Sequence, residues 1–165
     1  MTRYAAQTDV PSDRSRTEIE RTLSRYGADQ FIYGWEMTQA VIGFRAHAKQ
    51  VRFLLPLPDR QSREFKYTAE RHYLRSKTGQ QEAYEQAVRQ RWRALALVIK
   101  AKLEAVEAGI TEFEDEFMAH IVLPSGATVG AWMRPQIERA YQTGLMPPLI
   151  PALPPATQLS VVDGR

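Results

Sequence analysis

Apolar residues follow two different periods along the chain. Ile19, Leu23 and Tyr26 recur at helical spacing behind Ser15–Glu18, a capping-box sequence whose serine and glutamate side chains can satisfy free amides at a helix start. A glycine follows at position 27, where a helix commonly stops. We therefore predict a first helix over residues 16–26.

Residues 31–55 change to a period of two, which is typical of strands with one buried face. Short polar breaks divide this stretch into three runs, and Pro56 and Pro58 end it because proline cannot donate to a sheet ladder. We predict a three-stranded antiparallel meander, with helices covering one face. The alternation places aromatic rings on both faces: Phe31, Tyr33 and Trp35 on one, and Phe44 and Phe53 on the other.

The longest amphipathic pattern lies between a second capping box, Thr78–Gln81, and Gly109. Its apolar stripe consists of Tyr84, Val88, Trp92, Leu95, Ile99, Leu103 and Val106. A helix of this length extends about 40 Å and is the longest expected element. Cations flank the stripe on both sides. Their aliphatic stems can cover the edges of the core, or one flank can grip phosphates.

Two shorter helices are expected after the long one. Thr111–Glu114 is a third capping box, and Phe113 and Phe117 begin the apolar face of the first short helix. The second covers residues 129–141 and is kinked or restarted by Pro135.

Together these elements predict an α+β fold: an N-terminal helix, a three-stranded antiparallel meander, a long central helix across the sheet and a C-terminal helical subdomain. We assign residues 1–145 to one domain, within which residues 59–80 form a basic connection with room for a short hairpin. Residues 146–165 form a proline-rich tail, for which an extended or polyproline strand is expected.

Composition excludes several classes of chemistry. The 165 residues include no cysteine, so a disulfide, a thiolate zinc site and a cysteine nucleophile are all excluded. The N-terminus lacks the apolar segment of a secretion signal, and the longest apolar run is too short to span a membrane. We expect a cytoplasmic protein.

Charge is unevenly distributed behind a net value of +3. Residues 60–102 contain 11 Lys and Arg against four Asp and Glu, whereas residues 103–165 contain three against eight. The basic middle either meets an anionic partner or pairs internally with the acidic C-terminal part.

Three blocks carry a resemblance to a known family. They are VPSDRSRTEIERTLSRYGADQF at residues 10–31, RQRWRALALVIKAKLEAVEAGI at residues 89–110 and HIVLPSGATVGAWMRPQI at residues 120–137. From about Val10 to Leu149 the chain resembles an uncharacterised family of small proteins encoded by bacteriophages and prophages. The resemblance implies a bacterial host cell and transfers no catalytic residue, since the family has no settled activity. Residues 62–77 match none of its blocks.

The connection at residues 59–80 is the main candidate surface. Its cations, Arg60, Arg63, Lys66, Arg71, Arg75 and Lys77, are interleaved with Phe65, Tyr67, His72 and Tyr73. Cations attract phosphates and aromatic rings stack on unpaired bases, so this pattern is typical of nucleic-acid contact. A solvated loop whose rings anchor it to the core would show the same pattern.

Metal and catalytic motifs are weak. Glu112, Glu116 and His120 are spaced by four, so a helix would present them on one face, as a divalent-metal site or as an ordinary polar face near a helix N-terminus. The sequence has no HExxH, no phosphate-binding glycine loop and no dinucleotide fingerprint. We predict no metal, no cofactor and no catalytic residue, which favours a protein that is not an enzyme.

Two hypotheses for function follow. The first is a phage-encoded accessory protein that binds DNA or RNA through the connection and one flank of the long helix. Its predicted contacts are Arg60, Arg63, Lys66, Tyr67, Arg71, Tyr73, Arg75, Lys77, Arg89 and Arg93. The second is a modulator that binds a host protein, such as a defence component or an enzyme, through its acidic C-terminal part or its tail. The sequence leaves strand preference and oligomeric state open.

Overall fold

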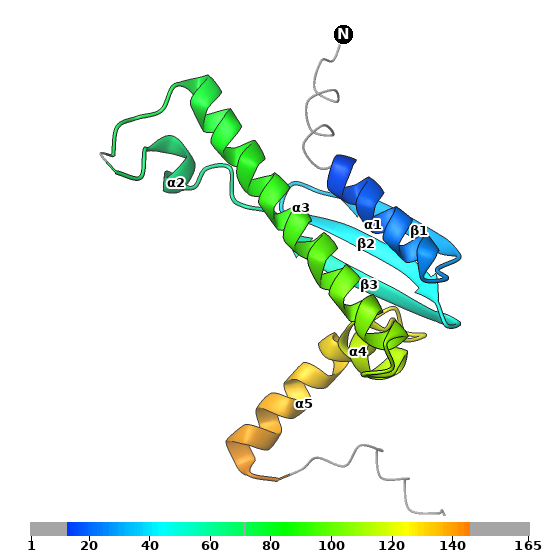
Figure 1. Cartoon of the computed structure of the whole chain (residues 1–165). Helices are drawn as coiled ribbons and strands as arrows, with labels where there is room; N and C mark the ends of the chain where they lie inside the picture. The colour runs from blue at the N-terminus through cyan, green and yellow to red at the C-terminus, as the bar shows by residue number, and fades with distance from the viewer. Residues whose placement is uncertain (1–12, 71, 146–165) are drawn as a thin grey trace, which may run out of the picture.

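The computed structural model of the protein describes residues 13–70 and 72–145, and the predicted α+β fold is confirmed in them (Figure 1). The elements in chain order are α1 (Asp13–Arg25), β1 (Gln30–Trp35), β2 (Gln39–Ala46), β3 (Lys49–Pro56), α2 (Arg63–Lys66), α3 (Lys77–Glu107), α4 (Phe113–Phe117), the 3-10 helix η1 (Met118–His120) and α5 (Val129–Thr143). The predicted proline-rich tail lies outside the described residues.

The three strands form the predicted antiparallel meander, in the order β1-β2-β3. Phe31 lies opposite Phe44, Tyr33 opposite Ile42, and Ile42 opposite Phe53. Because residues directly opposite each other share a face, all these side chains lie on one side of the sheet. The predicted division of the rings between two faces is therefore wrong. Turn lengths fix which residues are opposite each other, and alternation within each run does not reveal them.

Helices α1 and α3 cover this ring-bearing face, and their apolar stripes form the core with it (Figure 1). The buried residues of α3 are Trp92, Leu95, Ala96, Ile99 and Leu103, and those of α1 are Ile19 and Leu23. The Trp92 ring lies 5.6 Å from the ring of Tyr33 on β1. The opposite face of the sheet is open, since Ile32 and Leu54 are both more than half exposed there.

All three capping boxes misplace a helix start. Helix α1 already includes Asp13, so Ser15 lies inside it. Helix α3 starts two residues earlier than the capping box at Thr78 predicts, because the Ser76 hydroxyl accepts a hydrogen bond from a first-turn amide. Helix α4 follows Glu112, whose side chain makes no capping bond. Several Ser and Thr side chains could cap each start locally, and tertiary packing decides which residues enter the helix.

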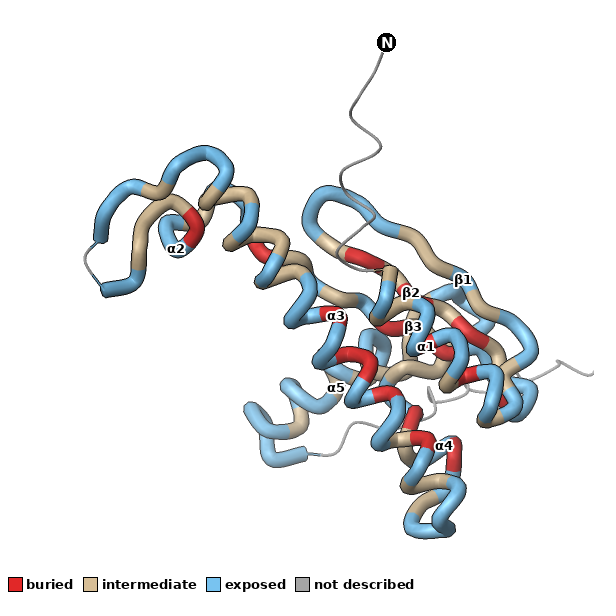
Figure 2. Tube along the Cα trace, turned by 45° about the horizontal axis from the view of Figure 1, so that its top comes forward, coloured by how far each residue is buried: buried red, intermediate tan, exposed pale blue. Residues whose placement is uncertain are grey.

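The C-terminal part is less tightly packed than the rest. Phe113 and Phe117 of α4 are buried against the core, but α5 contains no buried residue (Figure 2). Helix α5 runs through Pro135 as one element, so of the two predicted effects, a kink or a restart, the restart does not occur. The helix ends at Gly144 in the left-handed conformation. Within residues 13–70 and 72–145, no helix combines the length and apolarity that crossing a membrane requires.

Candidate functional site

The basic connection folds back beside the N-terminal end of α3, where that helix extends beyond the sheet (Figure 1). Its anchor is Phe65 of α2, which is buried with its ring edge-on to Tyr84 of α3 at 5.6 Å. This ring has the anchoring role that the loop interpretation assigned to the aromatics. We call residues 59–70 and 72–84 the basic arm.

A short hairpin completes the arm. The bridge between Tyr67 and Leu74 confirms it, and the Thr68 amide donates to the Tyr73 carbonyl at 2.9 Å. The Tyr73 amide in turn donates to the Thr68 hydroxyl at 3.0 Å. These bonds fix the backbone of Tyr73 while its side chain remains 64% exposed. The predicted contact Arg71 lies outside the described residues.

Three of the predicted cations meet in one cleft. Arg60, Lys66 and Lys77 come from three consecutive segments of the arm and line a shallow cleft of about 240 Å³. Three glutamines complete its lining: Gln61, Gln80 and Gln81. The Arg60 guanidinium donates to Gln81 Oε1 at 2.6 Å and lies over the Tyr84 ring at 4.9 Å. Neutral partners therefore position this cation and leave its charge uncompensated.

Arg63 and Arg75 are also held by neutral groups. The Arg63 guanidinium lies over the Tyr67 ring at 5.4 Å, and the half-buried Arg75 donates to the Tyr67 carbonyl at 3.3 Å. Among the described residues, no ion pair involves Arg60, Arg63, Lys66, Arg75 or Lys77. The free amides at the N-terminus of α3 add positive potential beside Lys77. Five cations and four carboxylates, Asp59, Glu64, Glu70 and Glu82, give the described arm a net charge of +1, and no described carboxylate lines the cleft itself.

The structure places the two predicted helix cations apart from this cleft. Arg89 forms an ion pair of 3.9 Å with Glu85. Arg93 lines a different cleft, between α3 and α1, together with Arg14 and Glu18. The basic arm alone is therefore the candidate surface that the geometry assembles.

Sequence reasoning missed the polar lining of the cleft. Gln61, Gln80 and Gln81 carry no charge, so a search for cations passes over them. Two consecutive glutamines in the first turns of a basic helix were the available signal. Amide side chains suit a nucleic-acid surface because they donate to and accept from phosphates, sugars and base edges.

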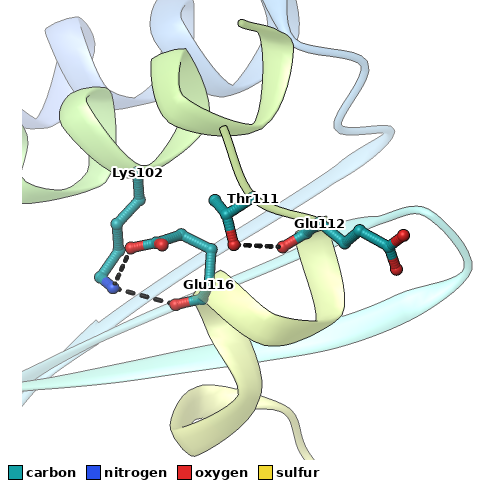
Figure 3. A network of polar contacts seen from close by, with 4 residues as sticks. All are labelled: Lys102, Thr111, Glu112 and Glu116. Atoms are coloured by element: carbon teal, nitrogen blue, oxygen red, sulfur yellow. Dashed lines mark hydrogen bonds and ion pairs between the residues drawn. The ribbon is translucent and has the colours of Figure 1, made fainter. Parts of the chain in front are cut away.

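The predicted face of Glu112, Glu116 and His120 does not form. Helix α4 ends at Phe117, so His120 falls in η1, where its ring stacks on Phe53 at 3.9 Å. Glu116 instead accepts from Lys102 of α3, through both its carboxylate and its backbone carbonyl (Figure 3). In the described part of the chain, no group of three or more His, Asp or Glu side chains is placed to hold a metal ion.

The environment of His120 favours its neutral form. Burial lowers the pKa of His120, and the nearby Lys102 ammonium lowers it further. A hydrogen bond with the Arg52 backbone acts in the opposite direction and is the weakest of the three effects. This imidazole therefore belongs to the packing between η1 and β3.

No protein-family model matches the chain, and comparisons with curated proteins and with solved structures give no significant match.

Proposed function

We propose that this protein binds nucleic acid through the basic arm. The observation that carries the proposal is the convergence of Arg60, Lys66 and Lys77 on one cleft, where none of the described carboxylates forms an ion pair with them. Cations that form internal salt bridges gain little from a phosphate, whereas uncompensated cations release counterions when they bind one. The glutamine lining adds hydrogen-bonding groups that fit sugar and phosphate oxygens.

The exposed ring of Tyr73 favours single-stranded over double-stranded partners. It stands on the hairpin of the arm with 64% of its surface open, and its backbone is fixed by two bonds to Thr68. A ring held in this way can stack on an unpaired base without losing further backbone freedom.

A phage-encoded accessory role in the cytoplasm of a bacterial host is part of this proposal. Its support is the resemblance of the three sequence blocks to phage and prophage proteins. Binding single-stranded DNA or RNA requires no catalytic group, which agrees with an arm built from cations, amides and one exposed ring.

The test is equilibrium binding of labelled single-stranded and double-stranded DNA and RNA by fluorescence anisotropy. Measurements at about 50 mM and about 200 mM salt separate phosphate contacts from other contacts. With about four phosphate contacts, affinity falls on the order of a hundredfold between these conditions, and single strands bind more tightly than duplexes. If no nucleic acid binds at the lower salt concentration, the proposal fails and binding to a host protein replaces it.

A further inference from the structure

Helix α5 is a long helix on which few of the described residues pack. It spans 15 residues, lacks a buried residue along its whole length, and contacts the rest of the chain at η1 (Figure 2). The contact is close at one point, where a β-carbon on Gly130 would lie 2.8 Å from the Ala119 carbonyl oxygen. Beyond this contact the helix extends away from the core (Figure 1).

Its solvent-facing side chains are unusually apolar for such a helix. Ile137 is 49% exposed and Tyr141 is 89% exposed, and together with Met133 they recur every four residues along one face of the helix. Isolated helices of this length are marginal in water, so packing normally stabilises them. A contiguous apolar stripe on an otherwise uncovered helix marks an interaction surface.

A groove runs beside this stripe. Its volume is about 500 Å³, and Met118 of η1 lines it together with Met133 and Ile137 of α5. Lys102 borders it from α3, and Arg134 and Glu138 border it from α5. An apolar floor with charges of both signs on its borders fits an amphipathic helix that carries charges of both signs.

The charges on α5 indicate which amphipathic helix fits the groove. Arg134 and Glu138 are four residues apart, so they lie on one flank of α5, next to Ile137. Neither forms an ion pair within residues 13–70 and 72–145. In an antiparallel pair about a two-fold axis near Gln136, Arg134 of each copy faces Glu138 of the other. The surface is therefore complementary to itself, as a two-fold dimer interface must be.

We propose that a second copy of this chain covers α5, with the two α5 helices antiparallel and each apolar stripe lying along the groove of the other. Ile137 and Tyr141 supply the apolar contact, and the two Arg134–Glu138 pairs fix the antiparallel register. This dimer uses the opposite end of α3 from the basic arm and leaves both arms accessible (Figure 1).

Sedimentation equilibrium of the full chain and four variants tests this proposal. The wild-type chain is dimeric at micromolar concentrations. Arg134→Glu alone and Glu138→Arg alone each set like charges against each other twice, and each weakens the dimer about tenfold or more. The double variant recovers the wild-type dissociation constant. Ile137→Asp, which places a charge in the apolar contact, sediments as a monomer.

Mixing the two single variants is the sharpest part of the experiment. In the mixed dimer, the glutamate introduced at position 134 of one chain faces the arginine introduced at position 138 of the other. The unchanged Glu138 of the first chain faces the unchanged Arg134 of the second. An Arg134→Glu chain and a Glu138→Arg chain therefore associate with each other more tightly than either does with itself.

Recovery in the mixture also shows that both variants are folded. A wild-type chain that remains monomeric overturns the proposal, and so do single variants that dimerise as the wild type does.

Discussion

The ammonium group of Lys102 on α3 lies 2.8 Å from Glu116 Oε1 and 2.9 Å from the Glu116 carbonyl oxygen (Figure 3). One lysine therefore fixes both the side chain and the backbone of the last turn of α4. The two side chains are 24% and 27% exposed, so water screens this pair less than it screens a surface pair. The contact ties the C-terminal helices to the end of α3.

Replacing Lys102 with Ala should reduce the free energy of unfolding by about 1–2 kcal/mol, because Glu116 loses a charged donor in a partly buried place. Urea denaturation of the two proteins measures the difference. Lys100→Ala is the matched control, since Lys100 forms an exposed pair with Glu104 on the same helix. The control should lose less than about 0.5 kcal/mol. Equal losses in both variants would contradict the anchoring role of Lys102.

The core position of Trp92 leads to a second prediction. Trp92 is 2% exposed and packs on Tyr33, so Trp92→Ala should cost about 3–5 kcal/mol of unfolding free energy. Leu97 is 57% exposed on the same helix, and Leu97→Ala should change the free energy of unfolding by less than about 0.5 kcal/mol. Thermal or urea unfolding distinguishes the two. A small loss at Trp92 would show that α3 does not pack on the sheet in this way.

The lowered pKa of His120 predicts a pH dependence of stability. Because folding lowers the pKa of this imidazole below its ordinary value of 6.5, the unfolded chain binds the proton more tightly than the folded chain does. The contribution to stability is complete above pH 6.5 and is lost as the pH falls from 6.5 through the folded pKa. Urea denaturation across this range should show an unfolding free energy that decreases as the pH falls, and His120→Gln should flatten that decrease. An unchanged slope in the variant would rule out His120 as its source.

Much of the fold could be predicted from the sequence because its signals are local. The apolar stripe through Trp92 and the alternation along the strands can both be recognised from residues that are close together in the sequence. The prediction that the aromatic rings are divided between the two faces of the sheet was wrong, because strand pairing across turns is a non-local property. That pairing places Phe44 opposite Phe31. Helix starts failed where several residues compete as caps, as Ser76 and Thr78 do.

The candidate site was only partly predictable for the same reason. The cations of residues 59–80 stood out by charge, but their convergence depends on Phe65 packing against Tyr84. That contact joins two segments whose separate patterns do not indicate it. The exposed face of α5 could not be predicted from the sequence either, since its apolar periodicity predicts burial that the described part of the chain does not provide.

Tyr73 supplies a prediction about strand preference. Tyr73→Ala should weaken single-strand binding by about tenfold, because stacking on one base is lost. Tyr73→Phe keeps the ring and should bind nearly as the wild type does. Duplex binding should change little in either variant, since paired bases offer no free face. Anisotropy titrations measure all three, and equal effects of the Ala change on single and double strands would contradict stacking by this ring.

The most direct test of the central claim is the salt dependence of nucleic-acid affinity in two variants with the same net charge. The arm variant combines Arg60→Gln, Lys66→Gln and Lys77→Gln, which neutralises the cleft. The control variant combines Arg14→Gln, Arg21→Gln and Arg25→Gln on the exposed surface of α1. Melting temperatures of both establish that they are folded. The logarithm of the dissociation constant for a labelled single strand is then plotted against the logarithm of salt concentration.

If the basic arm binds phosphates, the slope of the arm variant falls by about two to three and its affinity at low salt drops by more than tenfold. The control variant keeps a slope close to that of the wild type, because its charges lie outside the cleft. If the two variants give the same slope and the same affinity, net charge alone accounts for binding, and the basic arm is not the nucleic-acid site.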